Sequence, residues 1–279
     1  MNAPLVKCEQ ATPLLHRIEG GRGEAVLLLH GSASTGAFWR QPASLLQPLY
    51  RTIAPDLTGY GRSPAWAAAA SYAVDAEVHA LQSLLPCCAG KVHLVGHSYG
   101  GVVALMLALA NPARVRTLTL IEPVFFAALR YAGRDAPYRR FCAVRDAFLS
   151  SLARGEPEEA LPAFVGVWAG QGTWDDMPAT QRAAMLQMAD RIVLDWQASF
   201  AAEADARGLS TLGARTLLLC GDRSPEPMLD LVEALHLLMA GSTRVVVPGA
   251  GHLLPLTHAS ATTQAILSHF HADAERRLL

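Results

Sequence analysis

The chain has 279 residues, which is enough for one large domain or for a domain that carries an insertion. Its formal net charge is −1 and its lysines and arginines form no basic stripe, which argues against nucleic acid or an anionic membrane as a partner. Hydrophobic residues make up 51% of the sequence, so a sizeable core can be buried, yet no apolar run reaches transmembrane length.

The N-terminus and the cysteines indicate an intracellular protein. The first ten residues lack the charged-then-apolar layout of a signal peptide. The cysteines follow no metal-binding or redox spacing, which is typical of inert thiols in a reducing compartment. We therefore expect a soluble, cytoplasmic protein. The five cysteines are Cys8, Cys87, Cys88, Cys142 and Cys220.

Short apolar runs alternate with helical patterns along the first 123 residues. The short runs are typical of buried strands, whereas the longer Ala- and Leu-rich runs favour helices. This alternation predicts a mostly parallel sheet with helices on both faces and with its chemistry at the carboxyl ends of the strands. The predicted strands are 14–18 at an edge, 25–29, 51–54, 92–95 and 118–121, and the predicted helices are 38–49, 71–85 and 102–110.

The stretch 96–101, GHSYGG, joins a predicted strand directly to a predicted helix. A strand that turns into a helix within one residue forces that residue into a strained conformation, and a Cβ on either flank would collide with the turn. Gly96 and Gly100 supply the small flanks, so the Ser98 hydroxyl is expected at the exposed tip. We interpret Ser98 as a nucleophile rather than as a helix cap.

The character of the sequence changes between residues 124 and 212. This stretch is rich in alanine, carries many aromatic residues and methionines, and contains no convincing strand. The sheet pattern then resumes, with predicted strands at 216–220 and 244–247. We expect three segments: a first core segment 1–123, a helical insertion 124–212 over the carboxyl edge of the sheet, and a second core segment 213–279.

Four motifs follow one another along the two core segments: HGSASTGAFWR at 30–40, APDLTGYGRS at 54–63, GHSYGG at 96–101 and GAGH at 249–252. In this order they resemble the α/β-hydrolase fold family, in the branch with a helical cap inserted after the sixth strand. That branch includes esterases, haloperoxidase-like perhydrolases, carbon–carbon-bond hydrolases, epoxide hydrolases and haloalkane dehalogenases. A serine at position 98 argues against the last two groups, whose nucleophile is an aspartate.

The resemblance implies a histidine near the C-terminus as the general base. His252 fits, because it lies in a glycine-bracketed loop directly after the predicted strand 244–247. A serine hydroxyl is weakly nucleophilic at neutral pH and needs such a base. The competing histidines follow no strand directly; they are His236, His258, His269 and His271.

The acid of the triad is where the chain departs from the family. The usual G-x-x-D pattern here reads Gly221-Asp222-Arg223-Ser224, so a serine stands at the acid position. Glu122 is the favoured alternative, because some members take their acid from the strand that it ends. Pro123 predicts an extended backbone for Glu122. Asp222, two residues early, is the second candidate.

The resemblance also implies an oxyanion hole made of main-chain N–H groups, from Ser32 and Tyr99. His30, Asp56 and His97 belong to the matched motifs, and we interpret them as structural residues that tie loops together beneath the site.

Aromatic residues of the insertion are candidates for a substrate pocket, although at helical spacing such residues more often form a core of their own. These candidates are Phe125, Phe126, Trp168 and Trp174. The pair Arg139-Arg140 would suit a substrate carboxylate, but a solvated helix face is the favoured interpretation.

These residues favour a serine hydrolase that cleaves a small, largely apolar ester or related acyl compound through an acyl-enzyme, with no metal and no organic cofactor. One alternative is a carbon–carbon-bond hydrolase of a vinylogous diketone, which an aromatic cap permits. The other is a non-catalytic, ligand-binding member of the fold, which the missing acid at Ser224 motivates. The expected partner is a small-molecule substrate, whose identity the fold does not dictate, and the oligomeric state stays open.

Overall fold

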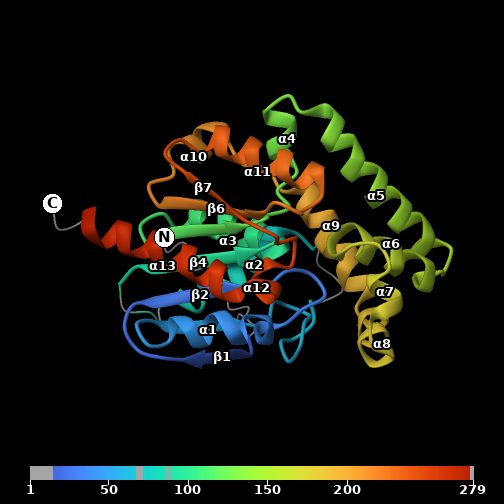
Figure 1. The fold of residues 1–279 in the computed structure, drawn as a ribbon, viewed down its shortest axis with the longest axis horizontal. Helices are drawn as coiled ribbons and strands as arrows, with labels where there is room; N and C mark the ends of the chain where they lie inside the picture. The colour runs from blue at the N-terminus through green and yellow to red at the C-terminus, as the bar shows by residue number, and fades with distance from the viewer. Residues whose placement is uncertain (1–14, 67–71, 86–87, 89, 277–279) are drawn as a thin grey trace, which may run out of the picture.

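A seven-stranded sheet forms the centre of the computed structural model, which describes residues 15–66, 72–85, 88 and 90–276 (Figure 1). The strands are β1 (Arg17–Gly20), β2 (Ala25–Leu29), β3 (Arg51–Pro55), β4 (Val92–His97), β5 (Val115–Ile121), β6 (Arg215–Gly221) and β7 (Thr243–Val247). They lie in the order β1-β3-β2-β4-β5-β6-β7, and β1 alone runs antiparallel to its neighbour. The predicted mostly parallel sheet is confirmed; the edge strand begins later than predicted.

Side chains of the parallel strands pack into two separate cores, one on each face of the sheet. In β2, Leu27 and Leu29 belong to one core, and Val26 and Leu28 belong to the other. All residues of β2 are buried. Because helices cover both faces, such strands are continuous apolar runs, and this is why the sequence reveals them.

Helices flank the sheet on both faces. Their bounds are α1 (Arg40–Leu46), α2 (Val74–Gln82), α3 (Tyr99–Ala110), α11 (Glu226–Leu238), α12 (Leu254–Thr257) and α13 (Ala259–Arg276). Helices α2, α3 and α11 pack in one core, and α1, α12 and α13 pack in the other. The helix predicted at 38–49 is divided into a 3-10 turn, Gly36–Trp39, and α1. In Figure 1, α13 crosses in front of the sheet.

Residues 124–212, all of which the structure describes, contain helices and no strand. The helices are α4 (Ala127–Tyr131), α5 (Asp135–Ala153), α6 (Pro157–Ala169), α7 (Thr173–Asp176), α8 (Ala179–Gln187), α9 (Ala189–Ala201) and α10 (Ala206–Ser210). We call them the helical insertion. The insertion follows β5, which is the fifth strand of the described residues. The family resemblance predicted that the insertion would follow a sixth strand. Helices α5 to α8 gather at one side of the molecule, on the right in Figure 1.

The described residues show neither a membrane span nor a metal centre. None of their helices is long and apolar enough to cross a bilayer. No group of His, Cys, Asp or Glu within them has the arrangement needed to hold a metal ion. The thiols of Cys142 and Cys220 form no disulfide within the described residues. Cys8 and Cys87 lie outside the described residues.

Three buried histidines predict that the stability of the folded protein depends on pH. Loss of hydration lowers the pKa of His30, His93 and His269 from 6.5 to about 4. The unfolded chain therefore binds more protons than the folded chain between these two values, and stability rises with pH there. We expect the free energy of unfolding to be highest above about pH 6.5 and to fall as the pH is lowered toward 4, by about 1.4 kcal/mol per pH unit and histidine at most. The urea midpoint of unfolding, measured at several pH values, should fall with it.

A variant checks the cause of this dependence. His269 lies against the sheet, where its Nε2 contacts the main-chain oxygen of Arg215 at 3.2 Å. His269→Gln removes one titrating group and should reduce the slope of the midpoint against pH. A midpoint that is the same at pH 7 and pH 5 in the unmodified protein would contradict the assignment.

Candidate active site

Ser98 lies at a tight turn between β4 and α3. Its φ of 54° falls in the left-handed region, which non-glycine residues seldom adopt. A Cβ on Gly96 would lie 2.2 Å from the main-chain oxygen of Gly100, and a Cβ on Gly100 would lie 2.4 Å from the carbonyl oxygens of Leu29 and His30. Glycine is required at both flanks, as the sequence predicted.

Backbone hydrogen bonds hold this turn in place. The Ser98 N–H donates to the Ile121 oxygen over 3.0 Å, and the Val124 N–H donates to the Ser98 oxygen over 3.3 Å. The turn is thereby tied to the end of β5 and to the residue that opens the helical insertion.

His252 lies in the loop after β7 and is 3% exposed. Its Nδ1–H donates to Glu122 Oε2 over 2.7 Å, so Nε2 is the unprotonated nitrogen of the neutral ring. The ring packs against Trp168 and His97, with centroid distances of 4.7 and 4.8 Å. The Nε2–H of His97 donates to the main-chain oxygen of His252 over 2.8 Å. These contacts fix the orientation of the imidazole.

Glu122 is completely buried and has an unusual backbone conformation. Its φ is +44°, so the prediction of an extended backbone before Pro123 is wrong. Tertiary contacts explain the difference: the carboxylate accepts hydrogen bonds from the Gly221 N–H, over 2.8 Å, and from the Ser224 hydroxyl. These bonds offset the local strain and leave the second oxygen to His252.

Ser224 and Asp222 have different places in the loop after β6. Ser224, at the position where the family pattern has its acid, supports Glu122 instead. Asp222 is exposed and accepts a hydrogen bond from the Gly249 N–H over 2.7 Å. The structure brings Glu122 to His252, whereas Asp222 caps a turn.

Two main-chain N–H groups near the Ser98 turn are available to a ligand. Ser32 follows β2 and Tyr99 begins α3, and neither N–H donates a hydrogen bond within the described residues. The neighbouring Ala33 has a φ of 56°. Ser32 lines the cavity that is described below. The side chain of Tyr99 is buried, and its hydroxyl contacts the hydroxyl of Tyr72.

His30 and Asp56 connect loops, as expected from the sequence. The Nε2 of His30 accepts a hydrogen bond from the Leu57 N–H over 2.9 Å, and Asp56 accepts one from the Gly36 N–H over 2.8 Å. Neither lines the cavity, whereas His97 does.

A cavity of about 390 Å³ opens beside Ser98 and His252. Its wall is mainly apolar and comes largely from the helical insertion. Among the described residues, Asp195 is the one Asp, Glu, Lys or Arg in that wall. The large apolar side chains in it include Phe126, Phe164, Trp168, Trp196, Met185 and Met188.

Two of the four predicted pocket residues, Phe126 and Trp168, line the cavity. Phe125 and Trp174 do not. Phe125 is fully buried in the core beside α3, and Trp174 packs in the core of the insertion. Phe125 and Phe126 are adjacent in a loop, and only Phe126 reaches the cavity.

Sequence reasoning did not assign Phe164, Trp196 or Asp195 to the wall. Helical spacing places such residues on a helix face, but it does not show which neighbour that face meets. For the arginine pair, the structure agrees with a solvated face: Arg140 pairs over 2.6 Å with Glu226, and both side chains are largely exposed.

The fold of the chain is matched in known proteins. The sequence profile described as "Alpha/beta hydrolase family" matches residues 26–265, which is most of the chain. The chain belongs to the alpha/beta hydrolase family. The chain is also similar in fold to the esterase EaEST from Exiguobacterium antarcticum, with a TM-score of 0.70 and 21% identity over 91% of this chain and 94% of that one.

Curated relatives of the chain include an esterase and a lipase. It is 31% identical to the pimeloyl-[acyl-carrier protein] methyl ester esterase of Methylococcus capsulatus over 258 residues, 88% of this chain and 94% of the esterase. It is 41% identical to lipase LipV of Mycobacterium tuberculosis over 146 residues, 52% of this chain and 51% of the lipase. The chain spans about half the length of LipV and of several other curated relatives that it matches.

Proposed function

We propose that this protein is a serine hydrolase that cleaves a small, largely apolar ester or related acyl compound through an acyl-enzyme. The observation that carries the proposal is the buried bond of 2.7 Å between His252 Nδ1 and Glu122, at the wall of a cavity that Ser98 also lines. A carboxylate, an imidazole and a hydroxyl in this order are the elements of nucleophilic acyl transfer.

In this mechanism the Ser98 Oγ attacks the carbonyl carbon while its proton passes to His252 Nε2. The N–H groups of Ser32 and Tyr99 donate to the oxyanion of the tetrahedral intermediate. The proton then moves to the leaving alcohol, and the acyl group stays on Ser98. Water attacks this ester and gives a proton to His252, and His252 passes that proton to the Ser98 Oγ as the bond to the acyl group breaks and the acid leaves. Glu122 keeps Nδ1 protonated and stabilises the imidazolium.

The helical insertion acts as a cap in this proposal. Its helices supply most of the apolar wall, which favours an apolar acyl group and excludes water from the reacting atoms. The volume of about 390 Å³ lies at the small end of the range typical of ligand pockets. The wall has no Lys or Arg among the described residues and carries the Asp195 carboxylate, so we expect an uncharged substrate rather than an anionic one.

The two alternatives have less support. A vinylogous diketone fits an aromatic wall, but nothing in the cavity distinguishes it from an ester of the same size. The non-catalytic alternative depended on a missing acid, and the contact of Glu122 with His252 counts against it.

Three compounds test the proposal: p-nitrophenyl butanoate, its acidic counterpart p-nitrophenyl hemisuccinate, and a vinylogous diketone of similar size. We expect kcat/KM for the butanoate to exceed that for the hemisuccinate by about tenfold or more, which corresponds to about 1.4 kcal/mol in the transition state. Faster cleavage of the diketone would favour carbon–carbon-bond hydrolysis. Tight binding of all three without turnover would overturn the enzymatic proposal.

A further inference from the structure

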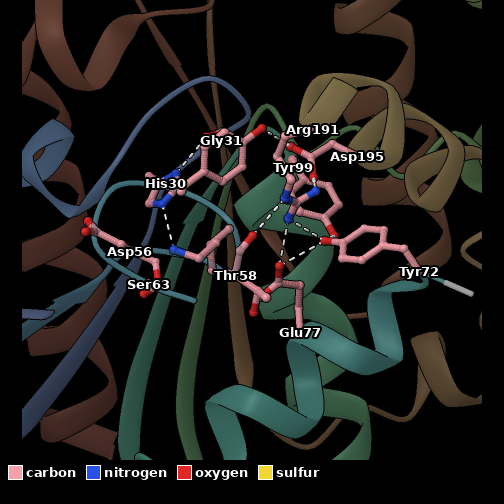
Figure 2. A network of polar contacts seen from close by, with 12 residues as sticks. His30, Gly31, Asp56, Thr58, Ser63, Tyr72, Glu77, Tyr99, Arg191 and Asp195 are labelled. Carbon is pink, nitrogen blue, oxygen red and sulfur yellow. Dashed lines mark hydrogen bonds and ion pairs between the residues drawn. The ribbon is translucent and has the colours of Figure 1, made fainter. Parts of the chain in front are cut away.

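A buried polar network joins α9 of the helical insertion to the sheet domain (Figure 2). Arg191 and Asp195 lie one turn apart on α9, and their side chains are 9% and 1% exposed and form an ion pair. Arg191 also pairs with the fully buried Glu77 of α2 over 2.8 Å. Its Nε–H donates to the main-chain oxygen of Thr58 over 2.7 Å. Arg191 of the insertion thus contacts both α2 and the loop after β3.

Tyrosine rings surround the guanidinium group of Arg191. Its central carbon lies 4.8 Å from the centroid of the Tyr60 ring and 4.4 Å from that of the Tyr72 ring. The Tyr72 hydroxyl accepts a hydrogen bond from Arg191 over 2.6 Å and donates one to Glu77 over 2.9 Å. These contacts and the two carboxylates compensate the positive charge of Arg191, so the guanidinium is not available to a ligand.

Asp195 differs from Arg191 because it reaches the cavity wall. Its Oδ2 accepts a hydrogen bond from the Tyr60 hydroxyl over 2.6 Å, and the same hydroxyl accepts one from the Ala33 N–H over 3.1 Å. Burial raises the pKa of Asp195 to about 6, although Arg191, the Ser32 side chain and Tyr60 all act to lower it. A carboxylate of the insertion therefore contacts the loop after β2 through Tyr60 and through Ser32.

The loop after β2 needs this support. Ala33 has a φ of 56°, a conformation that costs a non-glycine residue of the order of 1 kcal/mol and persists only where neighbours enforce it. The Tyr60 hydroxyl is the hydrogen-bond acceptor for its N–H. Ser32, one residue earlier, supplies the N–H that the proposed function assigns to the oxyanion hole.

We propose that Tyr60 and Asp195 are positioning residues for the oxyanion hole. The carboxylate on α9 orients the Tyr60 hydroxyl, the hydroxyl holds Ala33, and Ala33 fixes the direction of the Ser32 N–H. The insertion thereby contributes to the chemical step as well as to the substrate wall. This inference rests on the proposed function, because it concerns stabilisation of a tetrahedral oxyanion.

The test compares Tyr60→Phe with Tyr72→Phe, because each variant removes one phenolic hydroxyl from the network. Only the Tyr60 hydroxyl contacts the loop after β2, and Tyr72 does not line the cavity. With p-nitrophenyl butanoate, Tyr60→Phe should lower kcat by about 10- to 100-fold and change KM by less than about threefold. Tyr72→Phe should keep kcat within about threefold, while both variants lower the melting temperature to a similar extent.

A second measurement uses phenylboronic acid, which forms a tetrahedral adduct with a serine nucleophile and places an oxygen where the oxyanion forms. Its inhibition constant should rise in Tyr60→Phe by about the same factor as kcat falls, and it should stay unchanged in Tyr72→Phe. Equal effects of the two variants on kcat and on boronate binding would overturn the inference, as would a loss confined to KM in Tyr60→Phe.

Two further results separate this inference from the proposed function. If the unmodified protein neither hydrolyses the ester nor binds the boronate, the proposed function fails and the inference fails with it. If it does both and the two variants behave alike, only the inference fails. Asp195→Asn, which keeps the shape of the side chain, should lower kcat in the same direction as Tyr60→Phe; an Asp195→Asn protein that folds with unchanged kcat would contradict the role of α9.

Discussion

Ser98→Ala is expected to lower kcat for p-nitrophenyl butanoate by about 10⁵- to 10⁶-fold, the loss typical when a nucleophile that acts through an acyl-enzyme is removed. Alanine lacks the oxygen that would form the acyl bond, but it keeps the turn and the cavity. The affinity for p-nitrophenyl butyl ether, an uncharged analogue without a reactive carbonyl, should therefore change by less than about threefold when it is measured by calorimetry. Steady-state turnover measured at high enzyme concentration checks the loss.

Ser199 offers a matched control for this variant. It lies on α9, is 1% exposed and lines the same cavity, but it is not at the turn between β4 and α3. Ser199→Ala should keep kcat within about tenfold of the unmodified protein. A Ser98→Ala protein with more than about a hundredth of the original turnover would contradict the nucleophile assignment.

Glu122→Gln is expected to lower kcat by about 10⁴-fold, whereas Asp222→Asn should change it by less than about threefold. The Nδ1 of His252 donates to Glu122 Oε2, so a glutamine amide placed there would favour the wrong tautomer of the ring and would not stabilise the imidazolium. Asp222 accepts a hydrogen bond from a main-chain N–H and has no contact with His252 among the described residues.

The melting temperature provides a check on Glu122→Gln beyond the rate itself. The variant should lose rate while its melting temperature at pH 7 stays within a few degrees, since glutamine occupies the same volume. Equal losses in the two acid variants, or a larger loss in Asp222→Asn, would contradict the choice of Glu122.

Much of the fold can be predicted from the sequence because buried parallel strands are uninterrupted apolar runs. Ala25–Leu29 is an example, with all of its residues buried and helices on both faces. The turn at Ser98 is predictable for a steric reason, since glycine is the one residue without a Cβ to collide with neighbouring carbonyl groups. In both cases the signal is local in the chain.

The acid and the pocket are harder to predict because their contacts are not local. The prediction from Pro123 of an extended backbone at Glu122 was wrong, because hydrogen bonds from Gly221 and Ser224, about a hundred residues later, decide its conformation. Phe125 and Phe126 have the same chemistry, and packing alone decides which of them faces the cavity. The contact of Asp195 with Tyr60 has no local sequence signal, because Tyr60 lies 135 residues earlier in the chain.

The central claim is that Ser98 forms a covalent bond when His252 activates it. The most direct measurement treats the protein with a fluorophosphonate at pH 7 and maps the adduct by mass spectrometry of its peptides. We expect one phosphonyl group per chain, on Ser98, with labelling greatly slowed in His252→Gln. An adduct on another residue, or an unmodified Ser98 in a protein that still hydrolyses esters, would contradict the account.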